Sequence, residues 1–180
     1  MKKSVAILLG LVLCLSVILP AMAQDAAEPA AAAEDEANEY VVGGIVSFGD
    51  YEQDNDEGNG EEPIEWIVLA VDGDRALLLS LYALDAQPYN TYTKKITWCR
   101  SSLRLWLNYT FIKEAFTVQE REQIISSVIT NEKTPASDTY GCDDTTDQVF
   151  LLSYAEALEY LPDEDSRVTQ PTAYALANGA

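Results

Sequence analysis

The stretch Ile64-Glu65-Trp66-Ile67-Val68-Leu69, followed by Asp72-Gly73 and then by Arg75 to Leu81, decides how this chain folds. Two apolar runs on either side of an Asp-Gly dipeptide predict a β-hairpin, because this dipeptide favours the tight turn that joins antiparallel strands. Within the second run, Ala76 to Leu79 is apolar without alternation. This pattern predicts a strand that is covered on both faces.

Further strands are predicted on either side of the hairpin. Val41 to Phe48 has the pattern of a strand interrupted at Gly43-Gly44, and Asp50 to Glu62 is a polar, glycine-containing loop. Val149 to Leu152 is a short apolar run, which predicts a buried strand. We therefore expect a small antiparallel sheet.

Helices are predicted mainly from their capping residues. Ser101 or Ser102 can cap a segment with apolar residues at helical spacing, and Thr117 and Ser153 each precede a glutamate by three residues, as in a capping box. A last short helix is expected at about 172–177. Strands and helices together predict an α+β domain in which the helices pack on the sheet.

The N-terminus has the three parts of an export signal. Lys2 and Lys3 precede an apolar run from Val5 to Leu19, and Pro20 and Ala21-Met22-Ala23 follow it. Residues 1–23 are therefore predicted to be a cleavable signal peptide, and no membrane span is expected after cleavage. Residues 24–39 consist of alanine and acids with few other residues, which predicts a disordered linker, and residues 40–180 form the single predicted domain. The expected location is outside the cell, either secreted or at the cell surface.

The composition excludes several classes of function. The net charge is −19, and the predicted cleavage removes two lysines and no acid. Because a surface with this negative charge repels nucleic acid and anionic lipid, neither is an expected partner. The chain has no histidine, which excludes Ser-His-Asp and Cys-His catalysis and His-ligated zinc within this chain.

Cys99 and Cys142 are the cysteines that remain after the predicted cleavage. In an oxidising compartment they are a candidate disulfide, and two unpaired thiols are the alternative.

The loop after the first predicted strand is dense in oxygen ligands. Asp54, Asp56 and Glu61 are its candidate metal ligands, and calcium is the cation that such a flexible set of carboxylates favours. The alternative is a solvated acidic loop without an ion. No other cofactor is expected.

A second candidate site combines basic and aromatic residues between 89 and 104. Trp98, Arg100, Arg104 and Tyr89 could line a pocket for an anionic or sugar ligand. The alternative is that the basic side chains offset nearby acids and pack their stems against the core.

From Ile45 onward the chain resembles a family of uncharacterised domains in secreted or surface proteins of Gram-positive, often gut, bacteria. The segments that carry the resemblance include Phe48-Gly49-Asp50-Tyr51-Glu52-Gln53, Pro63 to Leu69, Ala76 to Ser80, Thr97-Trp98, Ser102 to Asn108, Ala115-Phe116, Asp147 to Ser153 and Thr172 to Ala175. The family is similar in architecture to C-type-lectin-like domains and to the formylglycine-generating enzymes. Members continue with a further Trp-Trp-Leu-Arg-Ser-like segment and a closing strand, so the resemblance implies a lectin-like fold that is incomplete at its C-terminal end.

These observations predict a non-catalytic extracellular domain that binds an unknown ligand, such as a carbohydrate or a surface protein. Two alternatives stay open: an enzyme-like relative of the formylglycine-generating fold and a structural module of the cell surface. The enzyme branch uses cysteines late in its chain for copper, and Cys99 and Cys142 match no such motif.

Overall fold

A computed structural model describes residues 14–18, 40–133 and 140–180 of the chain. These residues form a five-stranded antiparallel sheet with the strand order β2-β3-β4-β1-β7 and a two-stranded sheet of β5 and β6. The strands are β1 (Cys14–Ile18), β2 (Ile45–Tyr51), β3 (Glu62–Asp72), β4 (Arg75–Ser80), β5 (Ser127–Ile129), β6 (Thr145–Asp147) and β7 (Val149–Phe150). The predicted α+β class is confirmed.

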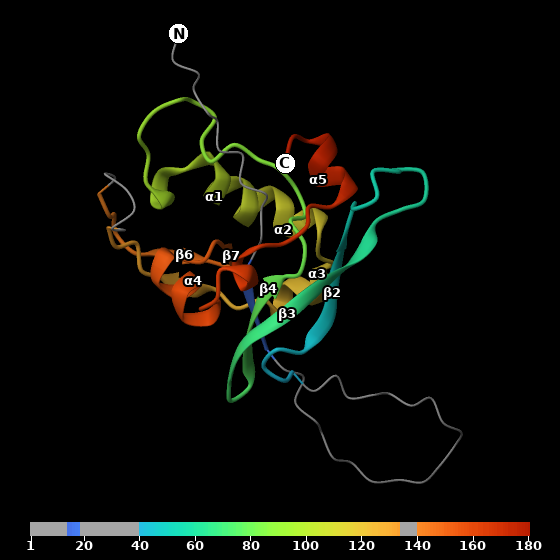
Figure 1. Ribbon diagram of the computed structural model, residues 1–180, viewed down its shortest axis with the longest axis horizontal. Helices are drawn as coiled ribbons and strands as arrows, with labels where there is room; N and C mark the ends of the chain where they lie inside the picture. The colour runs from blue at the N-terminus through green and yellow to red at the C-terminus, as the bar shows by residue number, and fades with distance from the viewer. Residues whose placement is uncertain (1–13, 19–39, 134–139) are drawn as a thin grey trace.

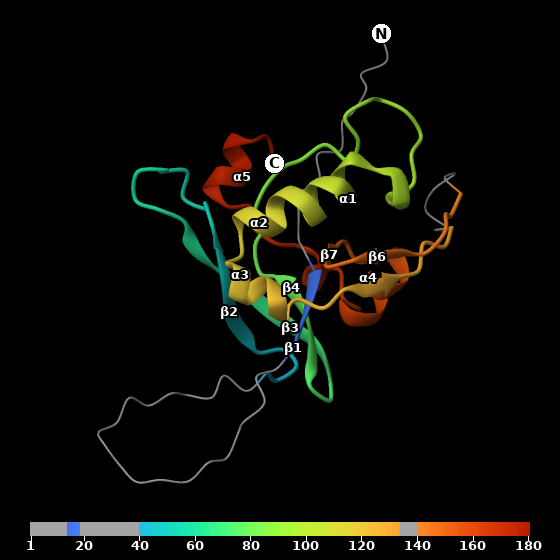
Figure 2. The ribbon, with the colours of Figure 1, turned by 180° about the vertical axis from the view of Figure 1, so that it is seen from behind.

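The helices lie between β4 and β5 and after β7. They are α1 (Ser102–Trp106), α2 (Ile112–Glu114), α3 (Val118–Gln123), α4 (Tyr154–Tyr160) and α5 (Ala173–Ala177), with 3-10 turns η1 (Trp98–Arg100) and η3 (Asp165–Arg167). A π-helical turn, η2 (Leu107–Phe111), joins α1 to α2. Both views of the ribbon show α5 beside α2 at one end of the molecule (Figures 1 and 2).

The predicted hairpin is confirmed. In it β3 pairs with β4 from Trp66↔Ser80 to Asp72↔Arg75, and Gly73 in the turn has a φ of +61°. Leu78 packs in the main apolar core with Trp66, whereas Leu79 packs in a second cluster on the other side of β4. Both faces of β4 are therefore covered, which explains its unbroken apolar run.

The first strand after the predicted linker begins later than its sequence suggests. Gly43 has a φ of +84° and donates its N–H to the Val68 carbonyl, and Gly44 N donates to Val41 O. These bonds make a turn, so β2 starts at Ile45 and extends to Tyr51, three residues beyond the predicted end at Phe48. The glycines that interrupt the pattern thus precede the strand.

The predicted caps are confirmed at three helices. Ser101 accepts a hydrogen bond from Arg104 N at the start of α1, and complete capping boxes at Thr117–Glu120 and Ser153–Glu156 open α3 and α4. Each cap satisfies backbone N–H groups that have no partner inside the helix.

An interior position of the large sheet, the fourth of five, is taken by an N-terminal segment. Cys14–Ile18 lies between β4 and β7, inside the stretch that the sequence identifies as an export signal. The rest of the predicted signal peptide and the predicted linker at 24–39 lie outside the described residues. Cleavage after Ala23 remains a prediction, and it would remove this strand.

Candidate functional site

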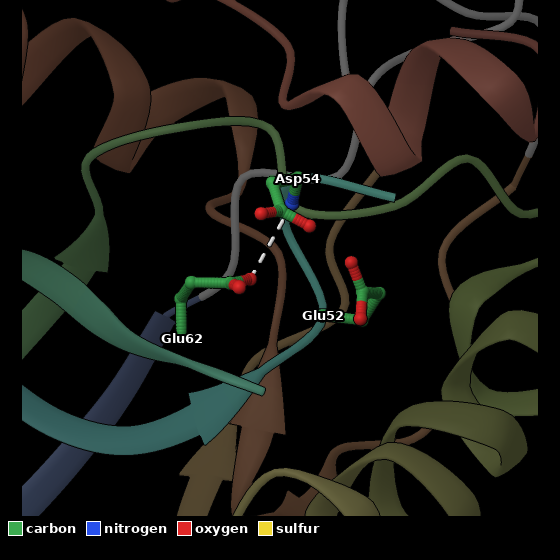
Figure 3. A group of neighbouring side chains, drawn as sticks. All are labelled: Glu52, Asp54 and Glu62. Atoms are coloured by element: carbon green, nitrogen blue, oxygen red, sulfur yellow. Dashed lines mark hydrogen bonds between the residues drawn. The ribbon is translucent and has the colours of Figure 1, made fainter. Parts of the chain in front are cut away.

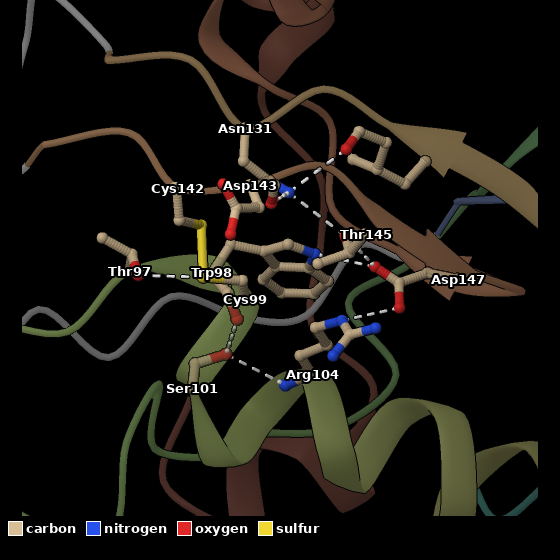
Figure 4. The surroundings of a disulfide bond; sticks show 11 residues. Thr97, Trp98, Cys99, Ser101, Arg104, Asn131, Cys142, Asp143, Thr145 and Asp147 are labelled. Carbon is tan, nitrogen blue, oxygen red and sulfur yellow. Dashed lines mark hydrogen bonds and ion pairs between the residues drawn. A yellow bond between two sulfur atoms is a disulfide. The ribbon is translucent and has the colours of Figure 1, made fainter.

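A buried carboxylate joins the helical layer to the small sheet. The carboxylate of Asp147, a residue that is 2% exposed, accepts hydrogen bonds from Arg104 Nε at 2.7 Å, Trp98 Nε1 at 2.9 Å and Thr145 Oγ1 at 2.7 Å (Figure 4). Ser101 holds the backbones of Trp98 and Arg104 together, because its hydroxyl donates to Trp98 O and accepts from Arg104 N. Both oxygens of Asp147 are therefore engaged within the protein.

This cluster accounts for two of the four predicted ligand-binding residues. The side chains of Arg104 and Asp147 are 22% and 0% exposed, and Arg104 also donates to Thr146 O. Because a buried charge is costly unless it is paired, this ion pair gives Arg104 and Trp98 a structural role. Arg104 still lines a small cavity of about 220 Å³ together with Asn108 and Gln148.

Asn108 has a structural role that the sequence did not predict. Its side-chain oxygen accepts from Gln148 N and Val149 N, and its amide nitrogen donates to Val149 O and Arg104 O. One side chain thus replaces a strand partner for the backbone at the start of β7. Nothing local in the sequence indicates this, since the bonded residues are some 40 positions apart.

A larger, open hollow lies next to the disulfide between Cys99 and Cys142. The hollow has a volume of about 900 Å³, within the range of roughly 300–1,000 Å³ that is common for small-molecule sites. We call it the basic hollow, because its charged lining comprises Lys95, Arg100, Lys133, Asp143 and Asp144. Tyr140 also lines it, and the Lys133 ammonium lies 5.9 Å from the centroid of the Tyr140 ring.

The disulfide brings the two walls of the basic hollow together. Cys99 belongs to η1 and Cys142 to the segment before β6, 43 residues later, and their Cα atoms are 6.5 Å apart (Figure 4). The hydroxyl of Thr97 lies 3.2 Å from the sulfur of Cys99. No pattern in the sequence places residues 95–100 beside Lys133 and residues 140–144, and the covalent link holds these segments together.

The two remaining predicted ligand-binding residues, Arg100 and Tyr89, lie in different parts of the structure. Arg100 lines the hollow and is exposed, whereas Tyr89 lines neither cavity. The backbone carbonyl of Tyr89 accepts from Leu103 N, and partial burial raises the pKa of its side chain. Lys133 and Tyr140 were missed because their place in the hollow depends on the Cys99–Cys142 pairing.

The acidic loop forms a different group of carboxylates from the predicted one. Glu52, Asp54 and Glu62 each place one oxygen within 4.8 Å of the others (Figure 3). Asp56 and Glu61 are not part of this group. Register explains the change, since Glu62 pairs with Tyr51 at the end of the β2–β3 ladder and so lies next to Glu52.

These carboxylates close the loop through hydrogen bonds. Glu62 accepts from Gln53 N at 2.7 Å, and Asp54 accepts from Asp56 N and from the Asn59 side chain, both at 2.8 Å. The hydrogen bond from Asn59 is the main cause of the lowered pKa of Asp54. Calcium takes six to eight oxygen ligands, so three single oxygens supply about half of a coordination shell.

A second buried carboxylate, Asp85, holds the C-terminal helix. It is 2% exposed and accepts from Tyr51 Oη at 3.0 Å, Ala86 N at 2.6 Å and Asn178 Nδ2 at 2.9 Å. Burial, and next the charge of Asp85, raise the pKa of Tyr51. This cluster connects β2, the segment after β4 and the end of α5.

Comparison with known proteins identifies the family. Residues 73–177, more than half of the chain, match the model of a domain of unknown function, DUF6273. The chain therefore belongs to the DUF6273 family. The match begins in the turn of the β3–β4 hairpin and includes the basic hollow.

Two further comparisons found no relative: no curated protein and no solved structure matches this chain. Within residues 14–18, 40–133 and 140–180, no helix has the length and apolarity needed to cross a membrane.

Proposed function

We propose that this DUF6273 protein is an exported, non-catalytic binding domain whose basic hollow receives an anionic ligand outside the cell. The observation that carries the proposal is charge segregation. The chain has 30 acidic and 11 basic residues, yet three basic side chains line one hollow with two acidic ones. A locally positive site on so negative a protein attracts anions that the remaining surface repels.

No carboxylate in the described part of the chain pairs with the three cations, and Lys133 lies beside the ring of Tyr140. Among the described residues the ion pairs are Arg104–Asp147 and Arg75–Asp74, so Lys95, Arg100 and Lys133 have no described ion-pair partner. All three are exposed. Arginine and lysine donate charge-assisted hydrogen bonds to carboxylate or sulfate oxygens, and an aromatic ring beside them can stack on a sugar.

Acidic carbohydrate is therefore the ligand class that we propose first. It combines anionic groups for the three cations with an apolar sugar face for Tyr140, 81% exposed. The setting that we propose, an exported domain of a Gram-positive bacterium with a C-type-lectin-like architecture, is supported by the sequence resemblance and by the N-terminal pattern. An experimental structure compared with lectin-like domains would test the architecture.

The ligand proposal can be tested on a glycan array that contains sulfated, uronic-acid and neutral sugars. We expect binding to the acidic sugars only, and binding should weaken as salt rises. Hits are then measured by calorimetry with the triple variant Lys95→Ala, Arg100→Ala, Lys133→Ala, whose affinity should fall about tenfold or more because charge-assisted hydrogen bonds are lost.

The matched control is Arg75→Ala, Lys94→Ala, Lys113→Ala. It removes the same charge from exposed residues that do not line the hollow. If both triple variants lose affinity equally, general electrostatics and not the basic hollow governs binding, and the proposal is wrong. Binding to neutral sugars at equal strength would also contradict it.

A further inference from the structure

The interior strand β1 is hydrogen-bonded on both edges. β1 pairs with β4 from Cys14↔Leu79 to Ile18↔Arg75, and with β7 through Cys14↔Phe150 and Leu15↔Val149. Beyond β7, Ile125 N donates to Ser16 O at 2.8 Å, and Val17 bridges to Ile124. The space between β4 and β7 therefore has the geometry of a complete strand position.

The side chains of β1 fill both apolar clusters. Leu15 and Val17 are 0% exposed in the main core, and Cys14, also 0% exposed, packs in the second cluster with Leu79 and Phe150. Ser16, on the same side of the strand as Cys14, is only partly buried. A strand in this position must therefore supply large apolar side chains at its second and fourth residues.

The same residues lie inside the predicted signal peptide, so export would remove them. In the described residues β4 and β7 pair with β1 and not with each other. Loss of β1 would leave two edges with unpaired backbone groups and an apolar gap between them. Such edges are templates for another strand.

We propose that the gap between β4 and β7, which we call the acceptor gap, binds an extended β-strand of a partner protein once the signal peptide has been removed. The proposal rests on export, which is part of the proposed function, but not on the basic hollow. The incoming strand has at least five residues, runs antiparallel to β4 and β7, and carries apolar side chains at its second and fourth positions. This is recognition by strand addition, in which the main chain gives affinity and alternate side chains give specificity.

The residues that remain N-terminal to the domain do not fit this pattern. Gln24 to Glu39 contains no β-branched or aromatic residue, and apart from Pro29 its apolar residues are all alanines, which are too small to replace Leu15 and Val17. Acids at the second or fourth position would be buried without a partner, and proline cannot donate to a ladder. We therefore assign the strand to a partner protein and not to residues 24–39.

The test begins with the full chain, in which a specific protease site replaces part of residues 24–39. After cleavage of the folded protein, we expect the N-terminal fragment to stay bound without a covalent link and to co-elute with residues 40–180 in size-exclusion chromatography. A labelled synthetic peptide of residues 12–19, with Cys14→Ser and a lysine tail, should then exchange into the gap and saturate.

The control peptide carries Leu15→Asp and Val17→Asp and should bind about 100-fold more weakly or not at all, because each aspartate would bury an unpaired charge. Hydrogen exchange should show slow exchange at the β4 and β7 amides that face the gap only while a strand is bound, whereas the β4 amides that bond to β3 should stay slow in both states. Release of the fragment with unchanged exchange and melting temperature would show that the gap closes by itself, and would overturn the proposal.

A last measurement addresses the natural protein. Intact-mass analysis of the exported form should give Gln24 as the first residue. In an exported chain that keeps residues 14–18, β1 would stay in place and the gap would never open. If the exported chain itself supplied another strand, the amides of β4 and β7 would exchange slowly without any added peptide. Either result overturns the partner assignment, whereas failure of the glycan array leaves it intact.

Discussion

At the scale of single residues, Gly49 combines a left-handed backbone conformation with close contacts at its Cβ position. Its φ is +74°, and a Cβ atom would lie 2.5 Å from both Ala115 O and the ring of Phe116. Gly49→Ala should therefore destabilise the protein by about 3 kcal/mol or more, because backbone and ring must move apart. Urea denaturation measures the loss.

Gly73→Ala is the matched control for Gly49→Ala. Gly73 also has a positive φ, +61°, but nothing lies within 4 Å of its Cβ position. Gly73→Ala should lower the free energy of unfolding by about 1 kcal/mol, which is the penalty of the left-handed conformation alone. Equal losses at both positions would show that the contact with Phe116 is not what requires glycine.

Asp147 carries a second prediction at the residue scale. Asp147→Asn keeps the shape but leaves the Arg104 guanidinium without its counter-charge, so we expect a loss of about 3 kcal/mol. Asp74→Asn is the comparison, since Asp74 and Arg75 form an exposed pair at 3.7 Å, which should contribute less than about 0.5 kcal/mol. The two values come from urea unfolding at one ionic strength, and a small loss at Asp147 would contradict the structural role of the pair.

Tyr51 makes stability depend on alkaline pH. Burial, with the nearby charge of Asp85, raises its pKa above the ordinary value of 10.0. The unfolded chain then loses this proton before the folded protein does, so stability is constant up to about pH 9 and falls as pH rises past 10.

Tyr51→Phe should make that decline shallower, although it lowers stability at pH 7 by about 1 kcal/mol through the lost hydrogen bond to Asp85. The slope decreases but does not vanish, because burial also raises the pKa of Tyr40, Tyr89 and Tyr160. Urea midpoints between pH 7 and 11 measure both effects. An unchanged slope in the variant would assign the pH dependence to other groups.

At the scale of elements, the Cys99–Cys142 disulfide joins η1 to the segment before β6. Closing a 43-residue loop should stabilise the fold by about 4 kcal/mol through the lower entropy of the unfolded chain. Cys99→Ser with Cys142→Ser should lower the free energy of unfolding by that order and weaken ligand binding in the basic hollow.

Thiol counting on unfolded, unreduced protein checks the bond directly. The full chain should give one free thiol, that of Cys14, and the exported form should give none. Two thiols in the exported form would rule out the bond.

At the scale of the whole molecule, the net charge of −19 governs the response to cations. We expect calcium and magnesium to raise the melting temperature equally at equal ionic strength, because both screen a strongly negative surface. The carboxylates of Glu52, Asp54 and Glu62 already accept hydrogen bonds from the loop, so they gain little from an ion.

The paired variants Asp54→Asn with Asp56→Asn and Asp143→Asn with Asp144→Asn separate screening from binding. Both should reduce the cation effect to the same small extent in thermal unfolding. A calcium-specific shift that disappears only in the Asp54/Asp56 variant would instead establish a calcium site in the acidic loop.

The sequence by itself determined the features that depend on neighbours within a few positions. The Asp72-Gly73 hairpin and the caps at Ser101, Thr117 and Ser153 follow from turn geometry and from backbone N–H groups that need a partner one turn away. These rules act over short distances along the chain, so a pattern of residues is enough to predict them.

Only the tertiary structure decided the contacts between distant segments. It placed Cys14–Ile18 between β4 and β7 and brought Lys95, Arg100 and Lys133 to one hollow. It also made Asp147 the hydrogen-bond acceptor of Arg104 and Trp98. Each of these arrangements depends on which apolar surfaces are buried together. Burial is non-directional and specifies no partner by residue type, so the partners are fixed only when the whole core packs.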